Sequence, residues 1–169
     1  MCSAFALFGR RSRRTLSITA AEHYANAALN WAETQTGKPY IYGGVGPYGY
    51  DCSGLIYAAF RHIGRPFPTW ARSTFSMLAW AGLRRIPIAG APRGALLFFG
   101  SGHVEFNTIW PNTSFGALQT GTLIGWHHYW WNSSWHPTAA YLVVGLPSGR
   151  CRWPVWSPLP MAGRRAPPP

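Results

Sequence analysis

The chain has 169 residues, enough for one compact domain with its own core, and its hydrophobic fraction of 47% is ordinary for a globular protein. Its 15 lysines and arginines against 4 acidic residues give a formal charge of +11, which favours anionic partners such as nucleic acid, acidic lipid or an anionic wall polymer. No run is long and apolar enough to predict a membrane span, and the first apolar stretch precedes the arginines, the reverse of a secretory signal.

The two ends differ in composition from the rest of the chain. We predict a basic flexible arm at residues 1–17 and a disordered tail, rich in proline and arginine, at residues 147–169. Two of the three cysteines fall in these ends, and no paired spacing indicates a disulfide framework or a zinc site. We therefore expect residues 18–146 to form the domain, with Cys52 as its internal cysteine.

Helical spacing dominates the first half of this expected domain. Apolar residues recur on one face over residues 17–37, with Ser17 placed to cap the helix. Residues 39–50 are rich in tyrosine and glycine, which predicts a loop with a tight backbone path. A second helix is expected over residues 52–64, and a shorter one follows a proline turn within residues 65–82.

Strand signals dominate the second half. Residues 93–100 predict a buried strand, and residues 103–110 predict its hairpin partner across a Gly-Ser-Gly turn. Another strand and turn are expected within residues 111–126, and residues 138–146 form a last β-rich run. Helices come first and an antiparallel sheet follows, which predicts an α+β fold.

Cys52 stands at the expected start of a helix, in the sequence Asp-Cys-Ser-Gly. Only the thiolate form of cysteine is a strong nucleophile, and the unpaired N–H groups of a helix N-terminus lower a thiol pKa. The small Ser53 and Gly54 leave room for a substrate carbonyl, whose oxyanion these N–H groups could bind. Asp51 would raise the thiol pKa by its charge, so we expect it to cap the helix or to hold a substrate amine.

A thiol nucleophile needs a general base, and His103 stands out among the six histidines. It opens an alternating strand after a glycine-rich turn, so its side chain lies on a definite face. Glu105 shares that face by the strand period of two. A lone histidine at a strand start is more often a surface residue, so the assignment depends on the wider pattern.

Three blocks in order supply that pattern: PYIYGGVGPYGYDCSGLIYAAF, RPFPTWARST and RGALLFFGSGHVEF. Together they resemble the NlpC-type cysteine peptidases, a family of bacterial and phage cell-wall hydrolases, over about residues 20–145. The resemblance implies a papain-like α+β domain with N-terminal helices packed on a small antiparallel β-sheet. It also implies cleavage of an amide bond in peptidoglycan stem peptides, often after D-glutamate, with no cofactor and no metal.

Position by position, the resemblance implies a role for five residues. Cys52 matches the nucleophile and His103 matches the base. Tyr40 matches a tyrosine near the thiol, and Asp51 and Ser53 match residues that in related enzymes help to hold the free amine of the substrate. Cys52 would attack the carbonyl, His103 would protonate the leaving amine, and water would release the acyl-enzyme.

The sequence departs from the family pattern at several positions. Tyr42 stands where tryptophan is usual, and Ala95 stands where aspartate is usual. No histidine follows on the next expected strand, where the family places a residue that orients the imidazole. We take Gln119 as this third catalytic residue, because orienting the imidazole asks only for an acceptor. The other candidates are Glu105, Asn107 and His127.

The segment GWHHYWWNSSWHP, residues 125–137, allows two interpretations. Tryptophan faces suit sugar rings, so the segment could form a surface that stacks carbohydrate or peptide. The alternative, which we favour, is a tryptophan-rich core and lid over the small sheet. No metal site is expected here, because adjacent side chains on a strand point apart and no cysteine or carboxylate is near. The histidines concerned are His127, His128 and His136.

The main hypothesis is a hydrolase of the cell wall, either a phage lysin released by a holin or a virion-associated enzyme. Its expected partners are peptidoglycan, anionic wall polymers and phage tail proteins. One alternative is a catalytically retired domain that only binds wall or tail, and another is an amidase or acyltransferase on the same Cys-His fold. Nucleic-acid binding rests on charge alone without a base-reading motif, so no specific nucleic acid is expected.

Overall fold

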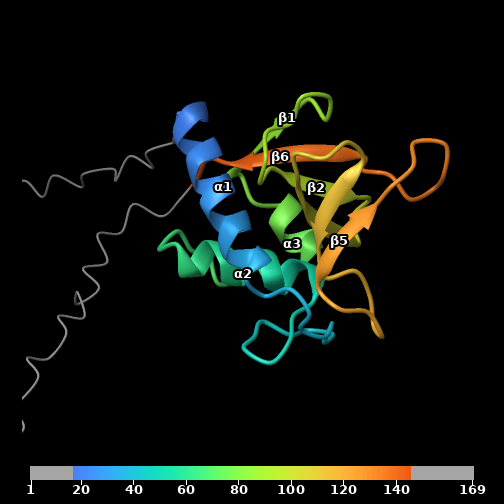
Figure 1. The fold of residues 1–169 in the computed structure, drawn as a ribbon. Coiled ribbons are helices and arrows are strands. Elements are labelled where there is room, and N and C mark those ends of the chain that lie inside the picture. The colour runs from blue at the N-terminus through green and yellow to red at the C-terminus, as the bar shows by residue number, and fades with distance from the viewer. Residues whose placement is uncertain (1–16, 146–169) are drawn as a thin grey trace, which may run out of the picture.

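The computed structural model describes residues 17–145, and the arm and tail predicted at the two ends lie outside the described residues, apart from Ser17. Figure 1 shows the helices gathered on one side of a single twisted sheet. The helices are α1 (Ile18–Glu33), α2 (Cys52–His62) and α3 (Thr74–Leu78). The strands are β1 (Leu83–Ile86), β2 (Leu96–Phe99), β3 (His103–Asn107), β4 (Thr113–Gly116), β5 (Gly125–His128) and β6 (Ala139–Val143). The predicted α+β architecture is confirmed.

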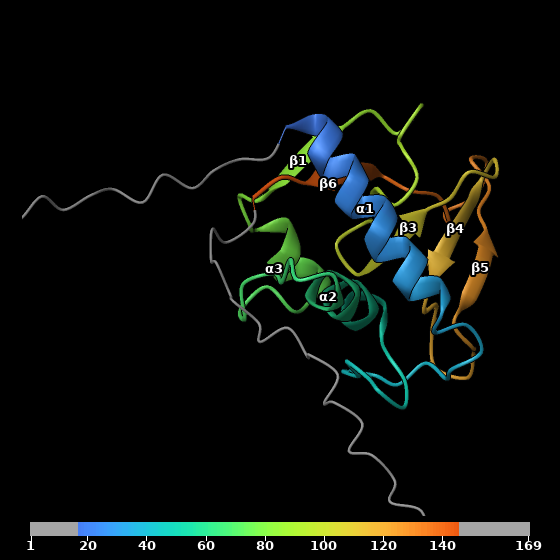
Figure 2. The ribbon, with the colours of Figure 1, turned by 60° about the vertical axis from the view of Figure 1, so that its left-hand side comes forward.

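Each long helix begins at a side-chain cap. The Ser17 hydroxyl accepts a hydrogen bond from the Ala20 N–H at the start of α1, as the sequence predicts. Asp51 caps α2 in the same way, through the N–H of Gly54. The buried face of α1 consists mainly of alanines, so the helix packs closely on α2 and β6, and Figure 2 shows it lying across the domain.

The sheet is antiparallel, with the strand order β1-β6-β2-β3-β4-β5. The sequence patterns predicted neither β1 nor β5, and both are edge strands. β1 carries the exposed Arg84 and Arg85 at its centre, so it lacks an apolar alternation. β5 consists of a glycine, a tryptophan and two histidines, so it has no aliphatic residue that would show the period of a strand.

The core lies between the helices and one face of the sheet. Val104 and Phe106 of β3 pack there with Leu55 and Ile56 of α2. Glu105 points to the opposite face, where it pairs across the strands with Leu97. That second face holds a smaller apolar cluster under the loop that joins β5 to β6. None of the described helices is both long and apolar enough to cross a bilayer.

Candidate active site

Cys52 is the first residue of α2, and its side chain is almost enclosed, at 7% exposure. Its Sγ lies 3.7 Å from the Oγ1 of Thr74, the first residue of α3. The N–H groups of Gly54 and Leu55 already bond to Asp51. The N–H groups of Cys52 and Ser53 precede the first intrahelical bond, so they remain free for a substrate oxygen.

Asp51 holds the loop before α2 against the start of the helix. Its Oδ1 accepts hydrogen bonds from the Gly54 N–H at 2.5 Å and the Ser53 hydroxyl at 3.1 Å, and its Oδ2 accepts one from the Gly43 N–H at 2.9 Å. Gly54 is required by packing, because a Cβ there would lie 1.9 Å from the carbonyl oxygen of Gly44. The first turn of α2 is therefore fixed by both its cap and a close backbone contact.

His103 begins β3 and brings its imidazole between Cys52 and Glu105. Its Nε2 lies 3.2 Å from Glu105 Oε1, although the contact is bent and gives no well-aligned hydrogen bond. Glu105 is completely buried, so its carboxylate is withdrawn from water. Side chains two apart on one strand share a face, and here that relation puts the carboxylate beside the imidazole.

These contacts shift the pKa values of the three groups. Burial raises the pKa of the Cys52 thiol, but the hydrogen bond with His103 and the imidazolium charge outweigh it, so the pKa is lowered from 9.0. Burial lowers the pKa of His103, but hydrogen bonding and charge at Cys52 and Glu105 raise it to about 9. Burial likewise opposes ionisation of Glu105, whose pKa is nevertheless lowered by His103 and His127. The arrangement favours a thiolate facing an imidazolium near neutral pH.

Glu105 is held by side chains from two further strands. The Ser114 hydroxyl of β4 donates to its Oε2 at 2.5 Å, and His127 Nδ1 of β5 lies 2.8 Å from its Oε1. Gly116 lies opposite on β4, where a Cβ would come within 2.7 Å of the Glu105 Cγ. The carboxylate therefore occupies space that any larger residue at position 116 would need.

A cavity of about 450 Å³, which we call the thiol cavity, opens beside Cys52. Its lining includes the three residues that the sequence predicts to bind substrate: Tyr40, Asp51 and Ser53. Burial, together with the negative charges of Cys52 and Asp51, raises the pKa of Tyr40, so its hydroxyl keeps its proton. Arg72 adds a positive charge to the lining.

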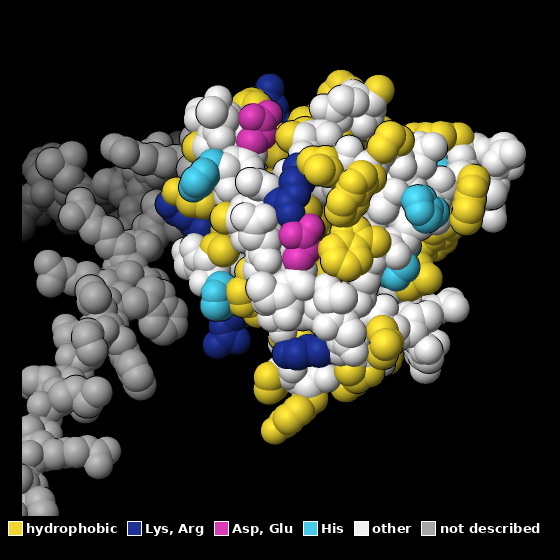
Figure 3. All heavy atoms as spheres, viewed as in Figure 1, with side chains coloured by type: hydrophobic (Ala, Val, Ile, Leu, Met, Phe, Trp, Pro, Cys, Tyr) yellow, Lys and Arg dark blue, Asp and Glu magenta, His cyan; other side chains and the backbone are white. Residues whose placement is uncertain are grey.

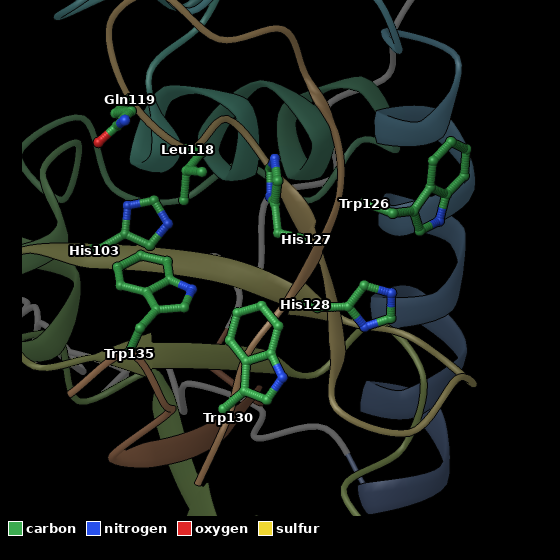
Figure 4. Close-up of a pocket in the computed structure, with 8 residues that line it drawn as sticks. All are labelled: His103, Leu118, Gln119, Trp126, His127, His128, Trp130 and Trp135. Atoms are coloured by element: carbon green, nitrogen blue, oxygen red, sulfur yellow. The ribbon is translucent and has the colours of Figure 1, made fainter. Parts of the chain in front are cut away.

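Gln119, the predicted third residue, lies in a loop after β4 and is exposed. It lines a second cavity together with His103 (Figure 4), but no hydrogen bond joins its side chain to the imidazole. Asn107 is engaged elsewhere, because its amide donates to the carbonyl oxygen of Ala91 at 2.7 Å. Of the candidates from the sequence, Glu105 is in contact with the imidazole, and His127 reaches Glu105.

The sequence patterns predicted no role for Thr74, Arg72 or Ser114. The first two follow a proline turn in RPFPTWARST, a block that the resemblance contained without assigning a role to any residue. Ser114 shows no sequence signal beyond its place in a short polar strand. Among residues 17–145, no group of three or more histidine, cysteine or acidic side chains is arranged to hold a metal ion.

Residues 37–112 match the model of the NlpC/P60 family, and this range contains Cys52, His103 and Glu105. This chain carries an NlpC/P60 domain. Among solved structures, the NlpC/p60 domain of the peptidoglycan hydrolase SagA superposes with a TM-score of 0.55 at 27% identity, over 70% of this chain and 97% of that one. The predicted family is confirmed.

Two curated relatives share part of this NlpC/P60 domain. Peptidoglycan endopeptidase RipB of Mycobacterium tuberculosis is 35% identical over 92 residues, which are 47% of this chain and 36% of RipB. Gamma-D-glutamyl-L-lysine dipeptidyl-peptidase of Bacillus subtilis is 38% identical over 96 residues, which are 55% of this chain and 31% of that enzyme. The chain spans between 11% and 36% of the length of the curated relatives it matches.

Proposed function

We propose that this NlpC/P60 domain is a cysteine peptidase that hydrolyses an amide bond in peptidoglycan stem peptides. The observation that carries the proposal is the enclosed thiol of Cys52 at a helix N-terminus, with the imidazole of His103 between it and the buried carboxylate of Glu105. Nucleophile, base and orienting acceptor in this order are the parts that amide hydrolysis requires. The family and the names of the relatives support the substrate class.

The reaction begins with attack by the Cys52 thiolate on the carbonyl carbon of the scissile amide. Negative charge moves to the carbonyl oxygen, which the free N–H groups of Cys52 and Ser53 are placed to bind. The His103 imidazolium then donates its proton to the leaving nitrogen as the C–N bond breaks. A thioester at Cys52 and a free amine are the products of this first half.

Water completes the cycle. The neutral imidazole of His103 takes a proton from the water as its oxygen attacks the thioester carbonyl. The C–S bond breaks, the acid product leaves, and the thiolate and imidazolium are restored. Tyr40 and Asp51 are proposed to hold the free amine of the substrate. The Asp51 carboxylate offers about four acceptor positions and accepts three hydrogen bonds within the protein, so one position is left for the amine.

We assign the orienting role to Glu105 in preference to Gln119. Glu105 Oε1 lies 3.2 Å from His103 Nε2 and the carboxylate is fully buried, whereas Gln119 is exposed and has no bond to the imidazole. A buried carboxylate also stabilises the imidazolium that forms during the reaction. The carboxylate that orients the His103 imidazole therefore comes from the same strand, β3, as His103 itself.

The decisive experiment is digestion of purified peptidoglycan by the wild-type chain and by Cys52→Ala, with mass spectrometry of the released fragments. We expect stem-peptide fragments with new termini from the wild type and none from the variant. Release of the same fragments by both proteins would rule out the thiol mechanism. If the folded wild type hydrolyses none of several peptidoglycan chemotypes, the proposal is wrong, and the alternatives are a catalytically retired binding domain or an enzyme that acts on a different acyl substrate.

The finer proposal is that the enzyme serves as a phage lysin or virion-associated hydrolase, with anionic wall polymers and phage tail proteins as further partners. The formal charge of +11 supports attraction to anionic wall polymers, and such attraction weakens as salt rises. Phage particles carrying the protein, detected by mass spectrometry of purified virions, would support the virion-associated role. Particles without the protein would leave the lysin role, which lysis on co-expression with a holin tests.

A further inference from the structure

A second cavity, of about 530 Å³, opens beside His103 and shares no lining residue with the thiol cavity. We call it the aromatic cavity. Its lining consists of His103, Leu118, Gln119, Trp126, His127, His128, Trp130 and Trp135. Its volume is within the range of small-ligand sites, about 300–1,000 Å³. Figure 4 shows that the lining comes from β3, β5 and the loops that flank β5.

We propose that the aromatic cavity binds neutral amino-sugar units of the glycan strand while the stem peptide occupies the thiol cavity. The inference rests on the proposed function for the identity of the polymer. It adds a sugar site to that function, and it assigns the tryptophan-rich segment a role in binding.

The tryptophans of this segment present ring surface to solvent. Trp130 is 59% exposed and Trp126 is 46% exposed, and Trp131 beside them is 52% exposed. These three residues are therefore not part of a core. Large rings left open to water at the rim of a cavity are typical of a binding surface, and their apolar faces suit the C–H faces of sugar rings.

Trp135 gives the cavity a fixed wall next to the base. Its ring stacks on Phe99 with centroids 4.6 Å apart and planes inclined by 16°, and it lies 5.1 Å from the ring of His103. Figure 4 shows Trp135 directly beneath His103. A ring held by two neighbouring rings loses little freedom when a ligand contacts it, which favours binding.

The lining of the aromatic cavity carries no lysine, arginine, aspartate or glutamate. Its polar groups are the amide of Gln119, three imidazoles and the indole N–H groups. A stem peptide brings carboxylates and amines. The charged group that borders this cavity, the His103 imidazolium, already faces Cys52 and Glu105, so the charges of a peptide would lose water here without an unshared opposite charge in return. An N-acetylated amino sugar brings only hydroxyl and acetamido groups, which the donors and acceptors of the lining can satisfy.

The thiol cavity has the opposite character, since Asp51 and Arg72 both line it. The charges of a peptide therefore have partners beside Cys52 and lack them in the aromatic cavity. His103 borders the aromatic cavity and is near enough to Cys52 to lower the pKa of its thiol, so a polymer can lie across both sites. On the right of Figure 3, histidines and hydrophobic side chains lie among neutral atoms, and the acidic and basic side chains lie toward α1.

The test measures binding without hydrolysis, on the Cys52→Ala background. Isothermal titration calorimetry with the tetramer of N-acetylglucosamine would compare this protein with versions that also carry Trp130→Ala or Trp70→Ala. Trp70 is the matched control, because it is 58% exposed and lies outside both cavities. We expect Trp130→Ala to weaken tetramer binding by about tenfold, the effect of removing a stacking anchor, and Trp70→Ala to leave it unchanged.

A second probe, a synthetic stem peptide without sugar, separates the two ligand classes. We expect its affinity to be the same with and without Trp130→Ala. No binding of the tetramer, equal loss with both tryptophan variants, or loss of peptide affinity with Trp130→Ala would each overturn the sugar site. Because no arm requires turnover, tetramer binding by a chain that fails to digest peptidoglycan would refute the peptidase and leave the sugar site standing.

Discussion

The thiol cavity contains Cys52 and the aromatic cavity contains His103, and the two cavities are built in different ways. The thiol cavity depends on consecutive residues around the start of α2, where a cap and a helix N-terminus fix the nucleophile. The aromatic cavity is assembled between residues 103 and 135, from β3, β5 and the loops on both sides of β5. The comparison shows that the nucleophile is set by local backbone geometry, whereas the environment of the base is set by tertiary packing.

The largest effect is expected from removal of the nucleophile, which should stop hydrolysis and leave sugar binding in the aromatic cavity unchanged. Cys52→Ala should lower the rate of hydrolysis by at least about 10³-fold, because no other group in the site can form the acyl-enzyme. The fold should persist, since cysteine and alanine differ little in volume. Assays of fragment release with circular dichroism as the control would check this, and the tetramer should still bind. Hydrolysis by Cys52→Ala at a rate near that of the wild type would contradict the assignment of Cys52 as the nucleophile.

The next largest effect concerns the residue behind the base. Glu105→Gln keeps the shape of the side chain but removes the charge that stabilises the imidazolium, so kcat should fall by about 10²-fold or more with KM little changed. Gln119→Ala is the comparison and should change kcat by less than about threefold, as exposed substitutions usually do. A larger loss at Gln119 than at Glu105 would return the orienting role to the loop after β4.

The sequence predicted the surroundings of Cys52 better than the surroundings of His103, and the reason is physical. The cap, the small residues and the nucleophile are adjacent in Asp-Cys-Ser-Gly, so one short motif contains the whole local geometry. The contact between Glu105 and His103 looked unfavourable, because side chains two apart on a strand rarely bond well. The structure shows what the sequence does not, namely that Ser114 and His127 contact the Glu105 carboxylate and hold it beside the imidazole.

The same difference applies to the fold. The helices were predictable because their caps and apolar spacing are local, and the central strands because they are continuous apolar runs. The edge strands β1 and β5 are stabilised by pairing with one neighbour each, which no local pattern records. The exposure of Trp126 and Trp130 was equally hidden, since a tryptophan in a short segment has the same sequence signal in a core and at a cavity rim.

Two glycines that pair across β4 and β5 give a matched test of the space around Glu105. Gly116→Ala places a Cβ 2.7 Å from the Glu105 Cγ, so it should displace the carboxylate, lower kcat and destabilise the fold by about 1–3 kcal/mol. Gly125→Ala meets no atom within 4 Å and should have little effect on either. Thermal unfolding and kcat for both variants would check this. Equal effects of the two substitutions would show that the position of Glu105 is not tightly constrained.

The pH dependence should show two limits. Activity should fall at low pH as the Cys52 thiolate is protonated, at a pH below the ordinary thiol value of 9.0, and fall at high pH as His103 loses its proton near 9.

The stability of the fold should also depend on pH. Stabilisation by the raised His103 pKa should be complete below about 6.5 and lost as pH rises through about 9. Stabilisation by the lowered Glu105 pKa should be present above 4.5 and lost as pH falls through its folded value. Rate profiles and thermal melts over pH would measure both, and a rate that keeps rising above pH 9 would contradict the assignment.

The most direct test of the thiolate–imidazolium pair is the rate at which iodoacetamide alkylates Cys52 as a function of pH, followed by mass spectrometry of the peptide that contains it. The account predicts that Cys52 reacts at a lower pH than the free thiol glutathione, and that His103→Ala removes this advantage. A Cys52 that titrates like glutathione in the wild type, or that stays activated without His103, would contradict the account.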